Sequence, residues 1–111
     1  MRSTRQSNRN YYEAIIQLRP ENKKLLDFVI NQIQINNKQD VFISQEYHKK
    51  YGTDLYISSR KFATLLGKRL KKSFKGELIT SRTLWSRDRQ SGKGIYRVTI
   101  CFRLEEETKT L

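Results

Sequence analysis

A helical repeat followed directly by a strand repeat is the feature that most limits what this chain can fold into. Apolar residues within 62–70 recur at the spacing of an amphipathic α-helix. Residues 94–104 instead alternate between apolar and polar side chains, as a half-buried β-strand does. We therefore predict a helix over residues 59–74, and a β-hairpin in which residues 77–87 pair with 94–104.

The segment upstream of this unit is predicted to contain two further helices. Residues 20–35 begin with the only proline of the chain, which suits the first position of a helix, and their apolar residues recur at helical spacing. Residues 41–43 are predicted as a short strand and residues 45–51 as a short helix. Residues 53–57 then form a connection, and Ser58 caps the helix that follows.

The two ends of the chain lack this periodicity. Residues 1–9 are polar and basic, and we expect a disordered arm that either reaches into a groove through its arginines or remains solvated. Residues 105–111 form an acidic tail. Residues 10–18 fit a helix that packs on the core or joins two subunits, but the run is short enough to be a strand. One domain over residues 10–104 is therefore expected.

The order of the predicted elements resembles the winged helix-turn-helix family over residues 20–104. The segment RKFATLLGKRLKKSF and the later GIYRVTI resemble, more loosely, winged-helix modules of phage and mobile-element replication proteins. The resemblance implies an α+β fold with a three-helix core and a C-terminal β-hairpin wing. In that family the reading helix corresponds to residues 59–74 and the wing to residues 82–97. The 111 residues contain no ATPase or primase domain to which an activity could be carried over.

The positive charge of the chain is concentrated in its second half. The formal net charge is +12, from 23 basic and 11 acidic residues. Residues 58–103 contain 13 basic residues against two acidic ones, an excess of 11. Such segregation favours a polyanionic partner, because an excess needed only for solubility would be scattered over the chain.

The expected binding surface combines helix 59–74 with the hairpin. Lysines of this helix fall opposite its apolar stripe and suit phosphates, whereas arginine can also read a guanine edge. Base readout is expected near the helix start, and Trp85 either stacks on an unpaired base or closes the core, where Tyr96 is also expected. The candidate nucleic-acid-binding residues are Ser59, Arg60, Lys61, Thr64, Lys68, Lys71, Lys72, Lys75, Arg82, Trp85, Arg87, Arg89, Lys93 and Arg97.

Several other kinds of site are not indicated by the sequence. The single cysteine, Cys101, cannot form an internal disulfide, which indicates a reducing compartment and a cytoplasmic or nucleoid-associated protein rather than a secreted one. His48 and this cysteine are too few for a metal site, and we expect no cofactor and no catalytic residue. No apolar run approaches the roughly 20 residues that a membrane-spanning helix needs.

The leading hypothesis is a non-enzymatic DNA-binding protein that acts as a transcriptional regulator or a replication accessory factor. It would place helix 59–74 in a groove, with the wing on the neighbouring backbone of double-stranded or single-stranded DNA. RNA is a less favoured partner, and the resemblance allows for a homodimer. The alternatives are a small basic RNA-binding protein and an RNA-cleaving toxin.

Overall fold

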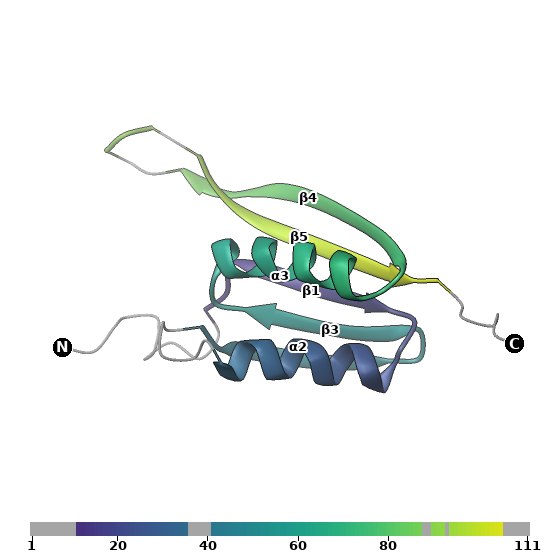
Figure 1. Cartoon of the computed structure of the whole chain (residues 1–111). Coiled ribbons are helices and arrows are strands. Elements are labelled where there is room, and N and C mark those ends of the chain that lie inside the picture. The colour runs from purple at the N-terminus through teal and green to yellow at the C-terminus, as the bar shows by residue number, and fades with distance from the viewer. Residues whose placement is uncertain (1–10, 36–40, 88–89, 93, 106–111) are drawn as a thin grey trace, which may run out of the picture.

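The described part of the protein forms a single mixed β-sheet with two helices on one of its faces. The computed structural model describes residues 11–35, 41–87, 90–92 and 94–105. In this part of the chain two helices and five strands follow one another as Figure 1 shows. Their bounds are β1 Ala14–Arg19, α2 Lys23–Ile35, β2 Ile43–Lys49, β3 Gly52–Ile57, α3 Arg60–Ser73, β4 Gly76–Arg87 and β5 Gly94–Leu104.

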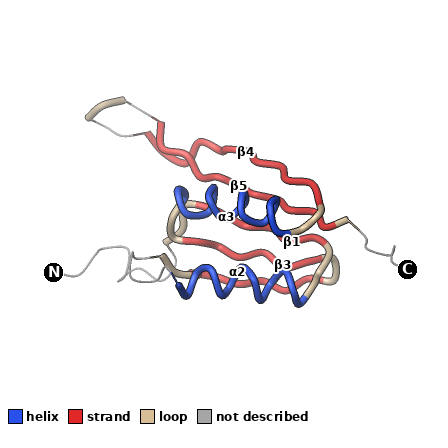
Figure 2. Tube along the Cα trace, in the orientation of Figure 1, coloured by secondary structure: helices blue, strands red, loops and turns tan. Residues whose placement is uncertain are grey.

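The first strand of the chain lies in the middle of the sheet, whose order is β2-β3-β1-β5-β4. β1 pairs antiparallel with β3 on one side and parallel with the last strand, β5, on the other. The strands β2 and β4 form the two edges, each antiparallel to its neighbour in sequence. Figure 2 shows the strands as one layer, with both helices in front of it.

Strict alternation along the central strands places the hydrophobic core on the helical side of the sheet. In β1, Ala14, Ile16 and Leu18 are at most 1% exposed, whereas the residues between them are only partly buried. Their cross-strand partners in β3 and β5 share this face, as Leu55 and Ile100 do on either side of Ile16. The helices complete the core with Leu25, Val29 and Ile33 of α2 and Phe62, Ala63, Leu66 and Leu70 of α3.

The two helices lie side by side over this face and contact each other directly. The ring of Phe28 in α2 packs edge-on against Phe74, which follows α3, at 5.5 Å between centroids. Arg69 of α3 donates a hydrogen bond of 2.5 Å to the side chain of Gln32 in α2. Arg69 is therefore turned toward the neighbouring helix and away from the exposed side of α3.

The predicted winged helix-turn-helix fold is wrong. Residues 45–51, predicted as the second helix of a three-helix core, lie mostly in strand β2, and residues 53–57, predicted as a connection, lie in β3. The hairpin of β4 and β5 is not a wing standing apart from a helical core. Its strand β5 pairs with β1 over the register from Val98 to Arg103, so most of its length belongs to the central sheet.

Local composition explains why the strand pair was missed. Edge strand β2 is half-exposed to exposed along its whole length, so it has no continuous apolar face to produce an alternating pattern. In β3 the opposite holds, because Gly52, Thr53, Asp54 and Leu55 are all buried. A strand buried on both faces also lacks alternation.

Other predictions agree with the structure. The predicted helix 59–74 corresponds to α3, and the predicted hairpin strands correspond to β4 and β5. The predicted helix 20–35 corresponds to α2, but it begins three residues later, where Asn22 accepts a hydrogen bond from the backbone of Leu25. Residues 10–18, for which helix and strand both remained open, contain β1. The predicted arm 1–9 lies outside the described residues, as does all of the acidic tail after Glu105.

The alternation in β1 predicts contrasting effects for neighbouring residues. Ile16→Ala should lower the free energy of unfolding by about 2–5 kcal/mol, because it leaves a cavity between the sheet and the helices. Gln17→Ala, one residue further on the opposite face, should cost less than about 1 kcal/mol. Urea unfolding of both variants is the measurement, and similar losses at the two positions would contradict the assigned faces.

Candidate nucleic-acid interface

Helix α3 carries the main concentration of exposed positive charge, and its local sequence fixes where it begins and how it faces. Ser59 is the N-cap, since its hydroxyl accepts a hydrogen bond of 3.0 Å from the backbone of Phe62. Ser58, predicted for this role, is buried and accepts a hydrogen bond of 2.9 Å from the backbone of Phe42. Gly67 faces Ile100 at close range, so α3 packs tightly on β5.

The side of α3 that faces solvent is almost uniformly cationic. The helix contains no acidic residue, and its buried residues all lie toward the sheet and α2. The exposed side, here called the lysine face, is formed by Lys61, Thr64, Lys68, Lys71, Lys72 and the following Lys75. Lysines spaced by three and four residues stack along one side of a helix, so their charges add along a line about as long as the helix itself.

Within the lysine face, three lysines have no partner among the interactions found in the described residues. These are Lys61, Lys68 and Lys72. Lys71 donates a hydrogen bond of 3.0 Å to the carbonyl oxygen of Gly76, and Lys75 lies 4.0 Å from the carboxylate of Glu105. Both contacts are exposed and weak, so they leave the two side chains able to turn toward an external anion.

Two arginines extend the positive surface from the start of α3 to the hairpin. Arg60 donates a hydrogen bond of 2.8 Å to the carbonyl oxygen of Tyr96, and its own backbone N–H donates to Glu13 at 2.8 Å. The guanidinium of Arg82 lies 5.2 Å from the ring centre of Tyr96. Tyr96 was expected in the core, but it is 38% exposed and its ring lies beneath a cation on the helical side of the sheet.

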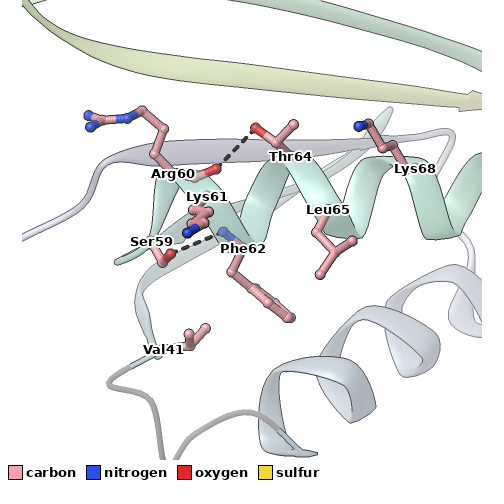
Figure 3. Close-up of a pocket in the computed structure, with 8 residues that line it drawn as sticks. All are labelled: Val41, Ser59, Arg60, Lys61, Phe62, Thr64, Leu65 and Lys68. Carbon is pink, nitrogen blue, oxygen red and sulfur yellow. Dashed lines mark hydrogen bonds between the residues drawn. The ribbon is translucent and has the colours of Figure 1, made fainter.

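A hollow at the start of α3 combines cationic and apolar side chains, as Figure 3 shows. Phe62 and Leu65 point from α3 toward α2, with Val41 below them, whereas Thr64 points to the other side. Leu65 belongs to the apolar repeat within residues 62–70, but it is 43% exposed. The hydroxyl of Thr64 donates to the carbonyl oxygen of Arg60 at 3.0 Å, so it is turned toward its own helix rather than outward.

The structure does not bring all the predicted binding residues together. Arg97 lies on the face of the sheet opposite the helices, where its guanidinium stacks on Tyr12 at 3.8 Å from the ring centre. It cannot join the lysine face in one continuous surface, so the structure does not bring it together with the predicted binding residues of α3. Arg89 and Lys93 lie outside the described residues, as do the side chains of Trp85 and Arg87.

The helix-free face of the sheet carries an aromatic cluster that the sequence reasoning missed. Tyr47 of β2 packs against Tyr56 of β3 at 5.3 Å between ring centres, and Tyr56 packs against Tyr12 at 4.7 Å. A bend at Glu13 brings Tyr12 onto this face, where Arg97 covers it. We call these three rings the tyrosine row. Period-two spacing within β2 and β3 would have revealed it, had those strands been recognised.

Two basic side chains beside the tyrosine row share one buried carboxylate, that of Asp54. Asp54 is 5% exposed. Its Oδ1 lies 2.7 Å from Nη2 of Arg19 in an ion pair that does not have the geometry of a hydrogen bond. Its other carboxylate oxygen is 3.2 Å from Lys49. The hydrogen bond and the charge of Asp54 raise the pKa of Lys49. Burial raises the pKa of Tyr56, and the neighbouring Tyr12, Tyr47 and Asp54 raise it further.

The fold and the lysine face define a small two-layer α/β domain with a surface suited to polyanions. Residues 11–104 match the family described as NMD3, second domain, and the chain belongs to this family. A nucleic-acid-associated or ribosome-associated role is compatible with that membership, which replaces the resemblance to winged-helix proteins. A search among curated proteins found no match.

Three further observations apply to the described part of the chain. No three side chains of His, Cys, Asp or Glu come together there in a group that could hold a metal ion. His48 lies on edge strand β2 and pairs with Glu46 at 2.6 Å. Neither of the two described helices is long and apolar enough to cross a membrane.

The raised pKa of Tyr56 predicts a pH-dependent contribution to stability. The hydroxyl of Tyr56 holds its proton more tightly in the folded protein than in the unfolded chain. The free energy of unfolding therefore falls once the pH is high enough for the unfolded chain to lose that proton. The free energy of unfolding of the wild type, minus that of Tyr56→Phe, should therefore fall as pH rises through and above 10.0, the ordinary pKa of tyrosine. Urea unfolding of both proteins at several alkaline pH values measures this difference. A difference that stays constant or grows would contradict the prediction.

Proposed function

We propose that this chain is a non-enzymatic nucleic-acid-binding domain that holds double-helical RNA through the lysine face of α3. The observation that carries the proposal is the series of exposed lysines along a helix with no acidic residue. Lysine is a compact point charge, which suits the phosphate backbone better than it suits the edge of a base. Membership of the NMD3 second-domain family, with its compatible nucleic-acid or ribosome role, supports this choice of partner.

The mode of binding follows from the side chains available on α3. The hydroxyl of Thr64 donates a hydrogen bond to the backbone of its own helix. The arginine at the helix start, Arg60, donates a hydrogen bond to the carbonyl oxygen of Tyr96. The remaining groups are lysines, which position a protein on a backbone without reading the sequence of the bases. The deep, narrow major groove of RNA also excludes a helix, so α3 would lie across the backbone rather than within a groove.

The toxin alternative is less well supported by this surface. General acid–base cleavage of RNA requires a titratable group within hydrogen-bond reach of the reacting hydroxyl. The lysine face contains no histidine, and the two carboxylates at its ends are already engaged, Glu13 with the backbone of Arg60 and Glu105 with Lys75. We therefore expect labelled RNA to remain intact after incubation with the protein.

Removing charge from the lysine face should weaken binding without unfolding the protein. The variant with Lys61, Lys68 and Lys72 changed to Gln should bind an RNA duplex more than about tenfold less tightly at low salt, because three phosphate contacts are lost. The slope of log K against log salt should also become shallower by about two to three units. Fluorescence anisotropy over a series of salt concentrations measures both quantities, and circular dichroism checks the fold.

A matched variant controls for net charge alone. Lys23, Lys24 and Lys50 are exposed on α2 and on the turn after β2, and their change to Gln removes the same charge from other surfaces. This control should keep affinity within about threefold of wild type, since only non-specific steering is lost. Equal losses in the two triple variants would refute α3 as the contact.

A further inference from the structure

The tyrosine row is a surface that duplex binding by α3 leaves unused. It lies on the opposite face of the sheet from the helices, so one rigid duplex cannot cover both surfaces with the same contacts. Three rings and one guanidinium follow one another across this face in the order Tyr47 of β2, Tyr56 of β3, Tyr12 just before β1, and Arg97 of β5. Such a row places flat, polarisable surfaces along a path transverse to the strands.

Tyr12 and Tyr56 are partly buried, but the exposure of Tyr47 argues against a purely structural role for this ring. The hydrophobic core lies on the other side of the sheet, so these tyrosines close no cavity there. Tyr47 is 45% exposed even though one edge of its ring packs on Tyr56, and Tyr51 in the turn beside it is 58% exposed.

The charges of this face suit a polyanion. Among its described residues the basic side chains Arg19, Lys49, Arg97 and Arg103 outnumber the acidic Asp54 and Glu77. Asp54 is buried and already paired with both Arg19 and Lys49, so it presents little negative charge to a ligand. Arg19 and Lys49 in turn lie 5.0 Å and 5.8 Å from the ring centre of Tyr51.

We propose that the tyrosine row is a second binding site, which stacks the unpaired bases of single-stranded RNA. Bases stack on aromatic side chains, and flanking cations hold the backbone that joins them. Phosphates alone would be served by cations without rings, and an apolar partner would not be matched by the surrounding charges. This site goes beyond the proposed function of α3 and does not depend on it.

Tyr47 offers the sharpest test because it is exposed on an edge strand and its removal leaves the core intact. The probe is a fluorescein-labelled oligouridylate of about ten nucleotides, within the usual site size of single-strand-binding modules. Tyr47→Ala should lower affinity for this probe by at least about fivefold, the loss expected for one stacked base. Tyr47→Phe keeps the ring and should bind within about twofold of wild type.

Controls separate this site from the lysine face. Tyr96→Ala removes an exposed ring from the helical side of the sheet and should leave binding of the single strand unchanged. Tyr47→Ala should bind an RNA duplex as tightly as the wild type does. Adding Tyr47→Ala to the triple α3 variant should lower its affinity for oligouridylate further. The two sites are therefore tested independently. Failure of the duplex experiment would contradict only the lysine face, and failure of the oligouridylate experiment would contradict only the tyrosine row.

Nuclear magnetic resonance gives an independent readout of stacking. Titration with the oligouridylate should shift the ring protons of Tyr47 and Tyr56 upfield, because a stacked base shields them. The proposal is overturned if wild-type protein does not bind the oligouridylate. It is also overturned if Tyr47→Ala binds it as tightly as wild type, or if the ring signals do not move.

Discussion

The parallel pairing of β1 with β5 is the contact on which the rest of the structure depends. It joins the first and last strands of the chain and places both in the middle of the sheet. Ile16 and Ile100 meet across this pair on the helical side, and Gly67 lets α3 approach them closely. Burying each such side chain is worth about 1.5–3 kcal/mol, so the pairing and the packing of α3 stabilise each other.

This arrangement also decides which side chains remain outside. Because the apolar residues of α3 lie on β5 and β1, its lysines point away from the sheet. The same alternation that buries Ile16 and Leu55 turns the neighbouring Tyr56 to the opposite face. The protein therefore has two chemically distinct surfaces on opposite sides of one sheet: a line of cations on a helix, and a row of aromatic rings with cations beside them.

The sequence was informative where local periodicity carried the signal and misleading where pairing was non-local. Helix α3 and strand β5 were predicted because each has a clear period, and the exposed lysines followed from the apolar stripe of the helix. Strands β2 and β3 were missed because neither alternates: β2 is an exposed edge strand, and β3 is buried at every position except Tyr56. The parallel pairing of β1 with β5 has no signature in the local sequence. This pairing makes the predicted wing part of the sheet and places Arg97 on the face away from α3.

Protection of lysines from chemical acetylation tests the central claim, that the lysine face of α3 meets the phosphate backbone. The protein would be acetylated briefly with and without a saturating RNA duplex, and each lysine quantified by mass spectrometry. Our account predicts strong protection of Lys61, Lys68 and Lys72, with Lys23 and Lys24 of α2 modified equally in both samples. Uniform protection of all lysines, or protection confined to α2, would contradict it.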